Sequence, residues 1–341
     1  MKRSSIQIVF LLPAALLLAA ALLALSACQK VLETVQEGDG TEICLSVSTE
    51  ASPDTKAAIV NSDADIQDGD IIIYAYFHST DTKYLGDGTV RLKYDDVNSL
   101  WYFDDGSGNP LHYYWPIVGS YYTAPDPDVP ATLDFIGYWP AITLGYITYF
   151  GKSGSGVQIT CSNLPGTVSP QEFLYVCMPN KSSTDQTGAA GGKLPLVLNH
   201  PFAKVNFQVV RSRIGLTLSS VVVSEFKNSG SFLSTANPQW SSLSGSQSFS
   251  MTSISHTYTG GYSFPDAIGG PFLAIPQSGT LTFTINASWP GWSPASQEIV
   301  KNVDFTWEPG RSYTYSLDLD TINFDVTVES WGTNTDYPLN Y

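Results

Sequence analysis

The sequence predicts an all-β protein made of two antiparallel β-sandwich domains in series. Its 341 residues include 19 Tyr, 16 Phe and 8 Trp, and aromatic residues of this kind are enriched in strands. The 28 Gly and 21 Pro are spread along the chain without a period, which is typical of turns between short strands. No segment shows a sustained helical period, so a sandwich architecture is favoured, and the length indicates two domains.

In the first half, the predicted strands are short aromatic or β-branched runs bounded by turn residues. Turns rich in Asp and Gly, such as 68–70 and 104–106, precede or follow several of them. Two aromatic runs end at a proline, Pro116 and Pro140, as expected of strand ends. In order, the runs are 43–48, 71–77, 90–94, 100–103, 113–116, 132–140, 157–161 and 173–178.

The second half repeats this pattern after a loop of small residues at 188–192. Its predicted strands are 202–210, 216–226, 247–254, 273–276, 281–287, 297–306, 312–319 and 322–331. We place the domain boundary just after the loop, near Leu196. This gives an N-terminal domain of residues 57–195 and a C-terminal domain of residues 196–341.

Residues 1–27 are expected to be a leader and not part of the fold. A basic start is followed by a nearly uncharged apolar run at 8–25, as in a secretory signal peptide. Leu25-Ser26-Ala27-Cys28 is similar to a bacterial lipobox, so we expect cleavage between Ala27 and Cys28 and acylation of Cys28. More than one acyl chain makes membrane anchoring stable. The alternatives are an uncleaved transmembrane helix, for which the run is just long enough, and a plain signal peptide that ends near a cysteine.

The charge of the chain argues against a nucleic-acid partner. Charged residues make up 14 % of the sequence and the formal net charge is −15. Binding to phosphate backbones depends on Lys and Arg clusters, which this chain lacks. An acidic surface instead keeps an exported protein soluble.

The cysteines give no sign of a disulfide scaffold or a metal site. Apart from Cys28 there are three, Cys44, Cys161 and Cys177, and no Cys-x-x-Cys pair occurs. Because Cys161 and Cys177 both lie in strand-like runs of an exported protein, we expect that they could pair with each other.

Catalytic and cofactor motifs are incomplete. The four histidines lack a second His or an acid at metal-ligand spacing, and we expect them at strand ends or facing solvent. The lipase-like run at 151–155 ends in Ser where Gly is required. The glycine-rich run before Lys193 is followed by Leu194, where a phosphate-binding loop needs Ser or Thr. No acid, base and nucleophile converge, so we expect a protein without enzymatic activity, cofactor or metal.

Two clusters leave alternatives open. Four acidic residues could hold calcium, but their spacing does not match an EF-hand and a turn explains them better; they are Asp63, Asp65, Asp68 and Asp70. Trp289 and Trp292 could present their rings to a sugar. The simpler interpretation is that they pack over their own turn.

The order of several short motifs resembles the fimbrillin-like subunits of type V pili, surface fibres that anaerobic diderm bacteria assemble from lipoprotein precursors. The resemblance covers nearly the whole chain and rests on the order and spacing of the motifs together. Besides the lipobox, the motifs are Thr55-Lys56-Ala57, Gly69-Asp70-Ile71, Tyr114-Trp115-Pro116, Leu133-Asp134-Phe135, Tyr138-Trp139-Pro140, His200-Pro201-Phe202-Ala203-Lys204-Val205, Ile275-Pro276-Gln277, Trp307-Glu308-Pro309-Gly310, Tyr313-Thr314-Tyr315 and Val326-Thr327-Val328-Glu329-Ser330-Trp331.

The resemblance implies two transthyretin-like domains, a lipid anchor in the outer membrane and assembly by strand exchange. In such systems a protease cuts after a basic residue that follows the first strand, here Lys56 before Ala57, and so releases residues 28–56 with the strand at 43–48. This chain has Lys where the family's best-known precursors have Arg. A C-terminal strand of another subunit then fills the groove. The implied donor residues are Ile322, Phe324, Val326, Val328 and Trp331.

We therefore expect a stalk, tip or anchor subunit of a surface pilus that supports adhesion. Its expected partners are other pilus subunits, outer-membrane lipid through acylated Cys28, and a host or bacterial surface receptor. The alternative is a lipid-anchored adhesin or glycan-binding lipoprotein that does not polymerise.

Overall fold

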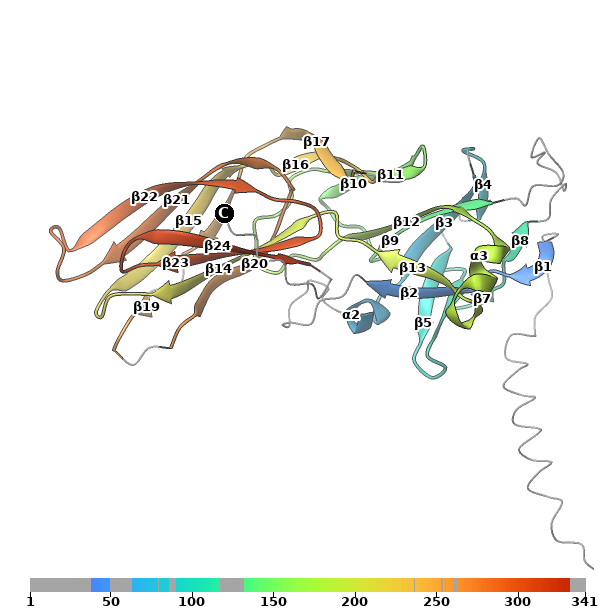
Figure 1. The fold of residues 1–341 in the computed structure, drawn as a ribbon, viewed down its shortest axis with the longest axis horizontal. Helices are drawn as coiled ribbons and strands as arrows, with labels where there is room; N and C mark the ends of the chain where they lie inside the picture. The colour runs from blue at the N-terminus through green and yellow to red at the C-terminus, as the bar shows by residue number, and fades with distance from the viewer. Residues whose placement is uncertain are drawn as a thin grey trace, which may run out of the picture.

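The computed structural model describes residues 38–49, 63–78, 80–85, 90–116, 132–235, 237–252, 254, 256–260 and 263–331. Within these ranges the chain is nearly all strand, which confirms the predicted all-β fold. The helical elements there are α2 (Asp63–Gln67), α3 (Ser183–Gly188) and the 3-10 turn η1 (Ala190–Gly192). None of these is long and apolar enough to cross a membrane. The two halves of the chain follow one another along the long axis of the molecule (Figure 1).

A central sheet organises the first half, with strand order β12-β9-β3-β5-β6-β7 and β4 paired to β3. Its strands are β3 (Ile71–Phe77), β4 (Lys83–Leu85), β5 (Arg91–Asp95), β6 (Leu100–Asp104), β7 (Pro110–Leu111), β9 (Leu133–Trp139) and β12 (Leu174–Lys181). Nearly every residue of β3 and β9 is buried. These strands are covered on both faces, which explains why they are almost continuously apolar.

Each face of the central sheet supplies a different core. One face packs on β2 (Leu45–Thr49) and β13 (Leu194–Leu198), which pair in parallel. β1 (Gly38–Glu42) pairs with β8 (Tyr114–Pro116) beside them. The other face contributes Tyr76, Ile136 and Tyr175 to a second core that residues of the second half complete.

The second half is a sandwich of a four-stranded and a five-stranded sheet. One layer has the order β20-β14-β23-β24 and the other β18-β15-β21-β22, with β19 paired to β15. Their inner faces share an aromatic core that contains Phe207, Phe249 and Phe283. The strands are β14 (Ala203–Arg211), β15 (Thr217–Phe226), β18 (Gln247–Met251), β19 (His256–Thr257), β20 (Asp266–Ala274), β21 (Ser278–Ser288), β22 (Ser296–Thr306), β23 (Arg311–Asp318) and β24 (Asn323–Ser330).

The two halves share one sheet and one core. β10 (Ile147–Ser153) and β11 (Gly156–Cys161) come from the first half and continue into β16 (Ser229–Leu233) and β17 (Gln239–Ser244) of the second. Phe202, Phe232 and Trp331 of the second half are buried in the same core as Tyr76. The predicted boundary between residues 195 and 196 falls inside β13. The domain division 57–195 and 196–341 stays a prediction.

The disulfide expected between Cys161 and Cys177 is wrong, because both thiols are free. The two residues lie on β11 and β12, which belong to different sheets. Burial raises the pKa of the Cys161 thiol to about 12 and also raises the pKa of Cys177. Both thiols therefore stay protonated and unreactive near neutral pH.

Gly137 in the middle of β9 tests how tightly the central sheet is packed. A Cβ atom at this position would lie 2.5 Å from the carbonyl oxygen of Ile72 on the neighbouring strand. We expect Gly137→Ala to lower the free energy of unfolding by about 1–3 kcal/mol, the usual cost of overpacking. Gly145→Ala is the matched control, since nothing lies within 4 Å of its Cβ position. Equal denaturant midpoints for the two variants would contradict the packing of β3 against β9.

Candidate functional site

Strand β2 pairs with β13, which forms no other ladder among the described strands. Leu45–Thr49 pairs residue by residue with Leu194–Leu198, in parallel. In the part of the chain that the structure describes, β2 and β13 form a sheet of two strands by themselves. Asn199, just after β13, forms one bridge to Tyr175 of β12. β13 therefore depends on β2 for nearly all of its backbone pairing.

Apolar side chains between β1 and β2 and at the start of β2 reach into the core of the first half. Ile43 is 2 % exposed and Leu45 is 3 % exposed. They share a core cluster with the three buried leucines of β13, at positions 194, 196 and 198, and with Trp115. Fully burying such a side chain stabilises the fold by about 1.5–3 kcal/mol. These two side chains are therefore part of the core and do not lie on its surface.

Polar contacts fix the junction between β1 and β2. The Ile43 amide donates to the Tyr113 carbonyl at 2.7 Å. The buried side chain of Gln186, on α3, bonds the backbone at Glu42 and Cys44. Glu42 also pairs with His112 through Oε1 and Nδ1 at 2.5 Å. The junction is therefore held by several elements of the first half.

Some of the predicted site residues fall outside the described residues. These are Ala27, Cys28, Lys56 and Ala57. The strand predicted at 43–48 is close to β2, which is shifted by two residues at its start.

The proposed donor segment is an edge strand in this structure. β24 pairs along its whole length with β23 of the same chain, and no strand of the described chain lies on its other side. Phe324 and Val328 pack against the core of the second half. Val326 is 38 % exposed, and Ile322 lies in the preceding turn at φ 57°.

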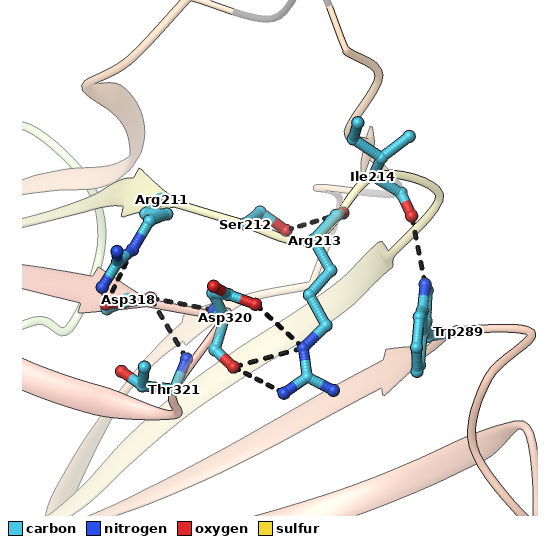
Figure 2. Close-up of polar contacts among 8 residues, drawn as sticks. All are labelled: Arg211, Ser212, Arg213, Ile214, Trp289, Asp318, Asp320 and Thr321. Atoms are coloured by element: carbon cyan, nitrogen blue, oxygen red, sulfur yellow. Dashed lines mark hydrogen bonds and ion pairs between the residues drawn. The ribbon is translucent and has the colours of Figure 1, made fainter.

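A carboxylate fixes the turn that leads into β24. Asp318 accepts hydrogen bonds from the side chain of Arg211 and from the amides of Asp320 and Thr321, as Figure 2 shows. The hydrogen bond from Arg211 lowers the pKa of Asp318 to about 2. Arg213 holds the carbonyl and carboxylate oxygens of Asp320 in the same turn. The start of β24 is thereby tied to the end of β14.

The other end of β24 is anchored by Trp331, which is 1 % exposed. Its ring stacks on His200 with centroids 4.1 Å apart, and Lys204 Nζ lies 5.3 Å from the ring centroid. His200 Nδ1 lies 2.6 Å from Glu172 Oε1, and both of these side chains are almost fully buried. His200 thus lies just past the end of β13, one of the two positions expected for the histidines, but its side chain is buried and does not face solvent.

The tryptophans considered for sugar binding are packed in the turn between β21 and β22. Trp289 donates its indole N–H to the Ile214 carbonyl at 3.0 Å, and the Arg213 guanidinium lies 5.1 Å from the centre of its ring (Figure 2). Trp289 and Trp292 also pack partly against the core of the second half. These contacts favour the packing interpretation over a sugar site.

Carboxylates near histidines form structural pairs, which the sequence analysis missed because the partners lie far apart in sequence. Asp134 is contacted by His78 at 2.6 Å and by Lys152 at 3.1 Å.

In the acidic cluster considered for calcium, Asp70 pairs with Arg91 at 2.9 Å. Among the described residues, no three His, Cys, Asp or Glu side chains are grouped as metal ligands.

Comparison with protein families gives a match to the fimbrillin-like family over residues 55–331. No curated protein sequence matches the chain. A fimbrial protein from Bacteroides vulgatus is similar in structure, with a TM-score of 0.54, 14 % identity, and coverage of 85 % of this chain and 99 % of that chain. The tip fimbrial protein Mfa3 from Porphyromonas gingivalis, with a C-terminal truncation, has a TM-score of 0.42, 10 % identity, and coverage of 85 % and 100 %. The fimbrial anchor protein Mfa2 from the same organism has a TM-score of 0.33, 8 % identity, and coverage of 85 % and 98 %.

We call β1, β2 and the two residues between them (38–49) the first segment. Substitution of Ile43 tests whether this segment is part of the core. We expect Ile43→Ala to lower the free energy of unfolding by about 2–5 kcal/mol, because it leaves a cavity beneath β13. Ser46→Ala is the control, since this half-buried side chain lies outside the apolar cluster. Urea titration followed by tryptophan fluorescence measures both variants. Equal midpoints would mean that the segment does not support the core.

Asp318 tests the turn before β24 through pH. Its pKa is about 2 in the fold and about 4 in an unfolded chain, so its contribution to stability is present above about pH 4 and is lost as the pH falls toward 2. We expect Asp318→Asn to flatten this acid loss slightly, since Arg211 is 59 % exposed and solvent screens the pair. Arg211→Gln should have the same effect. An unchanged acid limb of the melting temperature in both variants would contradict the assignment.

Proposed function

This chain belongs to the fimbrillin-like family, and from that premise we propose that it is a structural subunit of a bacterial surface fimbria that assembles by strand exchange. Family membership supports the role of fimbrial subunit and a place at the cell surface, and implies a function without catalysis. The observation that carries the exchange mechanism is the pairing of β13 with β2 alone among the described strands.

Removal of β2 would expose the edge of β13 along Leu194–Leu198. We call this vacated edge the seat, and we expect it to bind another strand. Five consecutive residues of β13 would lose their ladder, and unpaired backbone groups away from water are costly. Three leucine side chains, now at most 3 % exposed, would also be uncovered. An open apolar strand edge is a template for another chain. Strand addition to such an edge combines main-chain hydrogen bonds with pockets for alternate side chains.

We propose the C-terminal segment of another copy, or of another subunit, as the strand that fills this seat. Phe324, Val326 and Val328 alternate along β24, so their side chains fall on one face of the strand. A donor role requires that β24 leave β23 and that Trp331 leave its buried position in the same step. The proposed donor residues remain Ile322, Phe324, Val326, Val328 and Trp331.

The precursor is proposed to hang from the outer membrane by acylated Cys28 and to be activated by cleavage between Lys56 and Ala57. That cut would release residues 28–56, including β1 and β2. A subunit that is never cut would keep its lipid and its first strand and would serve as an anchor. The proposal is therefore compatible with a stalk, tip or anchor position in the fimbria.

Cleavage at Lys56 tests the proposal. Limited trypsin treatment of the mature chain is expected to cut after Lys56 and to produce oligomers, since the vacated seat on β13 must be refilled. Lys56→Gln should remain uncut at this position and monomeric, whereas the control Lys227→Gln should behave like the unmodified chain. N-terminal mass spectrometry and size-exclusion chromatography report the two steps. A chain that is cut after Lys56 and stays monomeric would contradict polymerisation and favour the adhesin that does not polymerise.

A further inference from the structure

Gln186 is a buried polar side chain whose hydrogen bonds converge on the first segment. It lies on α3 and is 4 % exposed. Its Nε2 donates to the Glu42 carbonyl at 2.8 Å, and its Oε1 accepts from the Cys44 amide at 3.0 Å. The same Oε1 accepts the indole N–H of Trp115 at 3.0 Å. A side chain therefore occupies the place where a neighbouring strand would otherwise pair.

The side-chain amide is well matched to this position. A carbonyl and the amide two residues later point to the same side of an extended strand. A primary amide carries one acceptor oxygen and N–H donors, so it can complement both groups at once. Leu194 continues the pairing by donating its amide to the Cys44 carbonyl at 2.9 Å. Gln186 therefore bonds the backbone at Glu42 and Cys44, and β13 pairs with the residues that follow.

The helix that carries Gln186 is itself held at its first turn. Asp185 accepts from the amide of Ser182 at 2.8 Å and from its hydroxyl at 2.7 Å. These hydrogen bonds lower the pKa of Asp185. Trp115 is 1 % exposed and shares the oxygen of Gln186. The amide is therefore fixed from two sides.

We propose that Gln186 sets the register of whichever strand occupies the seat on β13, first the chain's own segment and then a replacement from a second copy. This inference rests on the proposed function. When the first segment leaves, the buried side-chain amide of Gln186 loses its partners at Glu42 and Cys44 but keeps the hydrogen bond from the Trp115 indole. A buried polar group left without a partner is costly. An occupant must restore both lost hydrogen bonds with a free carbonyl and a free amide two residues later.

The requirement selects among occupants. A proline or an N-methylated residue at the position of Cys44 has no N–H and cannot satisfy the oxygen of Gln186. A slip of one residue would also turn the side chains at the positions of Ile43 and Leu45 away from the core. The expected partner is therefore an extended segment with apolar residues at both positions and no proline between them.

Hydrogen–deuterium exchange of the intact chain tests the contact without any assembly. We expect Gln186→Ala to speed exchange of the segment 43–49 by roughly tenfold or more, because a buried backbone donor loses its acceptor. Gln186→Glu keeps the size and the acceptor oxygens but cannot donate to Glu42, so it should also speed exchange. Thr187→Ala is the control, since this exposed hydroxyl bonds Thr184 on the same helix. Equal exchange in all four proteins would overturn the proposal.

A peptide of residues 41–49 tests the register after cleavage at Lys56. We expect the peptide to bind the cleaved chain and to lose roughly tenfold or more in affinity when the Cys44 nitrogen is methylated. The loss should vanish in Gln186→Ala, which makes the pair of changes a thermodynamic cycle. An equal loss in Gln186→Ala and in the unmodified protein would overturn the assignment. If exchange responds as expected but the cleaved chain stays monomeric, the contact stands and the proposed function fails.

Discussion

The pairing of β13 with β2 is the constraint on which the account of this protein depends. A strand whose side chains are buried must also satisfy its backbone groups, and within the described chain β13 has one ladder, to β2. One short segment meets both requirements. β2 pairs with the backbone of β13, and Ile43 and Leu45 cover the apolar core. A replacement strand must therefore supply backbone hydrogen bonds to β13 as well as apolar side chains for the core.

His200 links β13 to the end of the proposed donor strand. β13 ends at Leu198, and His200, two residues later, stacks on Trp331 at the end of β24. The same core joins the two halves through Tyr76 and Phe232, and one sheet carries strands of both. The end of β24 and the residues after β13 are therefore joined by packed side chains.

The sequence predicted the strands that have a clear local signal. The runs at 71–77 and 297–306 match β3 and β22 to within one residue, because alternation or continuous β-branched and aromatic residues mark them. It did not predict β13, because the domain boundary was placed near Leu196, inside this strand. It also missed β16 and β17, since serine-rich strands lack an apolar period. The partners of Gln186 and His200 were out of reach, because residues 28 to 144 positions apart are brought together only by the fold.

The most direct test of the exchange mechanism is an electron-microscopy density map of oligomers formed after cleavage at Lys56. The account predicts that each β13 is paired along Leu194–Leu198 with a strand that belongs to a neighbouring subunit, with an amide at hydrogen-bonding distance from Gln186. Density in which β13 still carries its own residues 45–49, or has no strand beside it, would contradict the account.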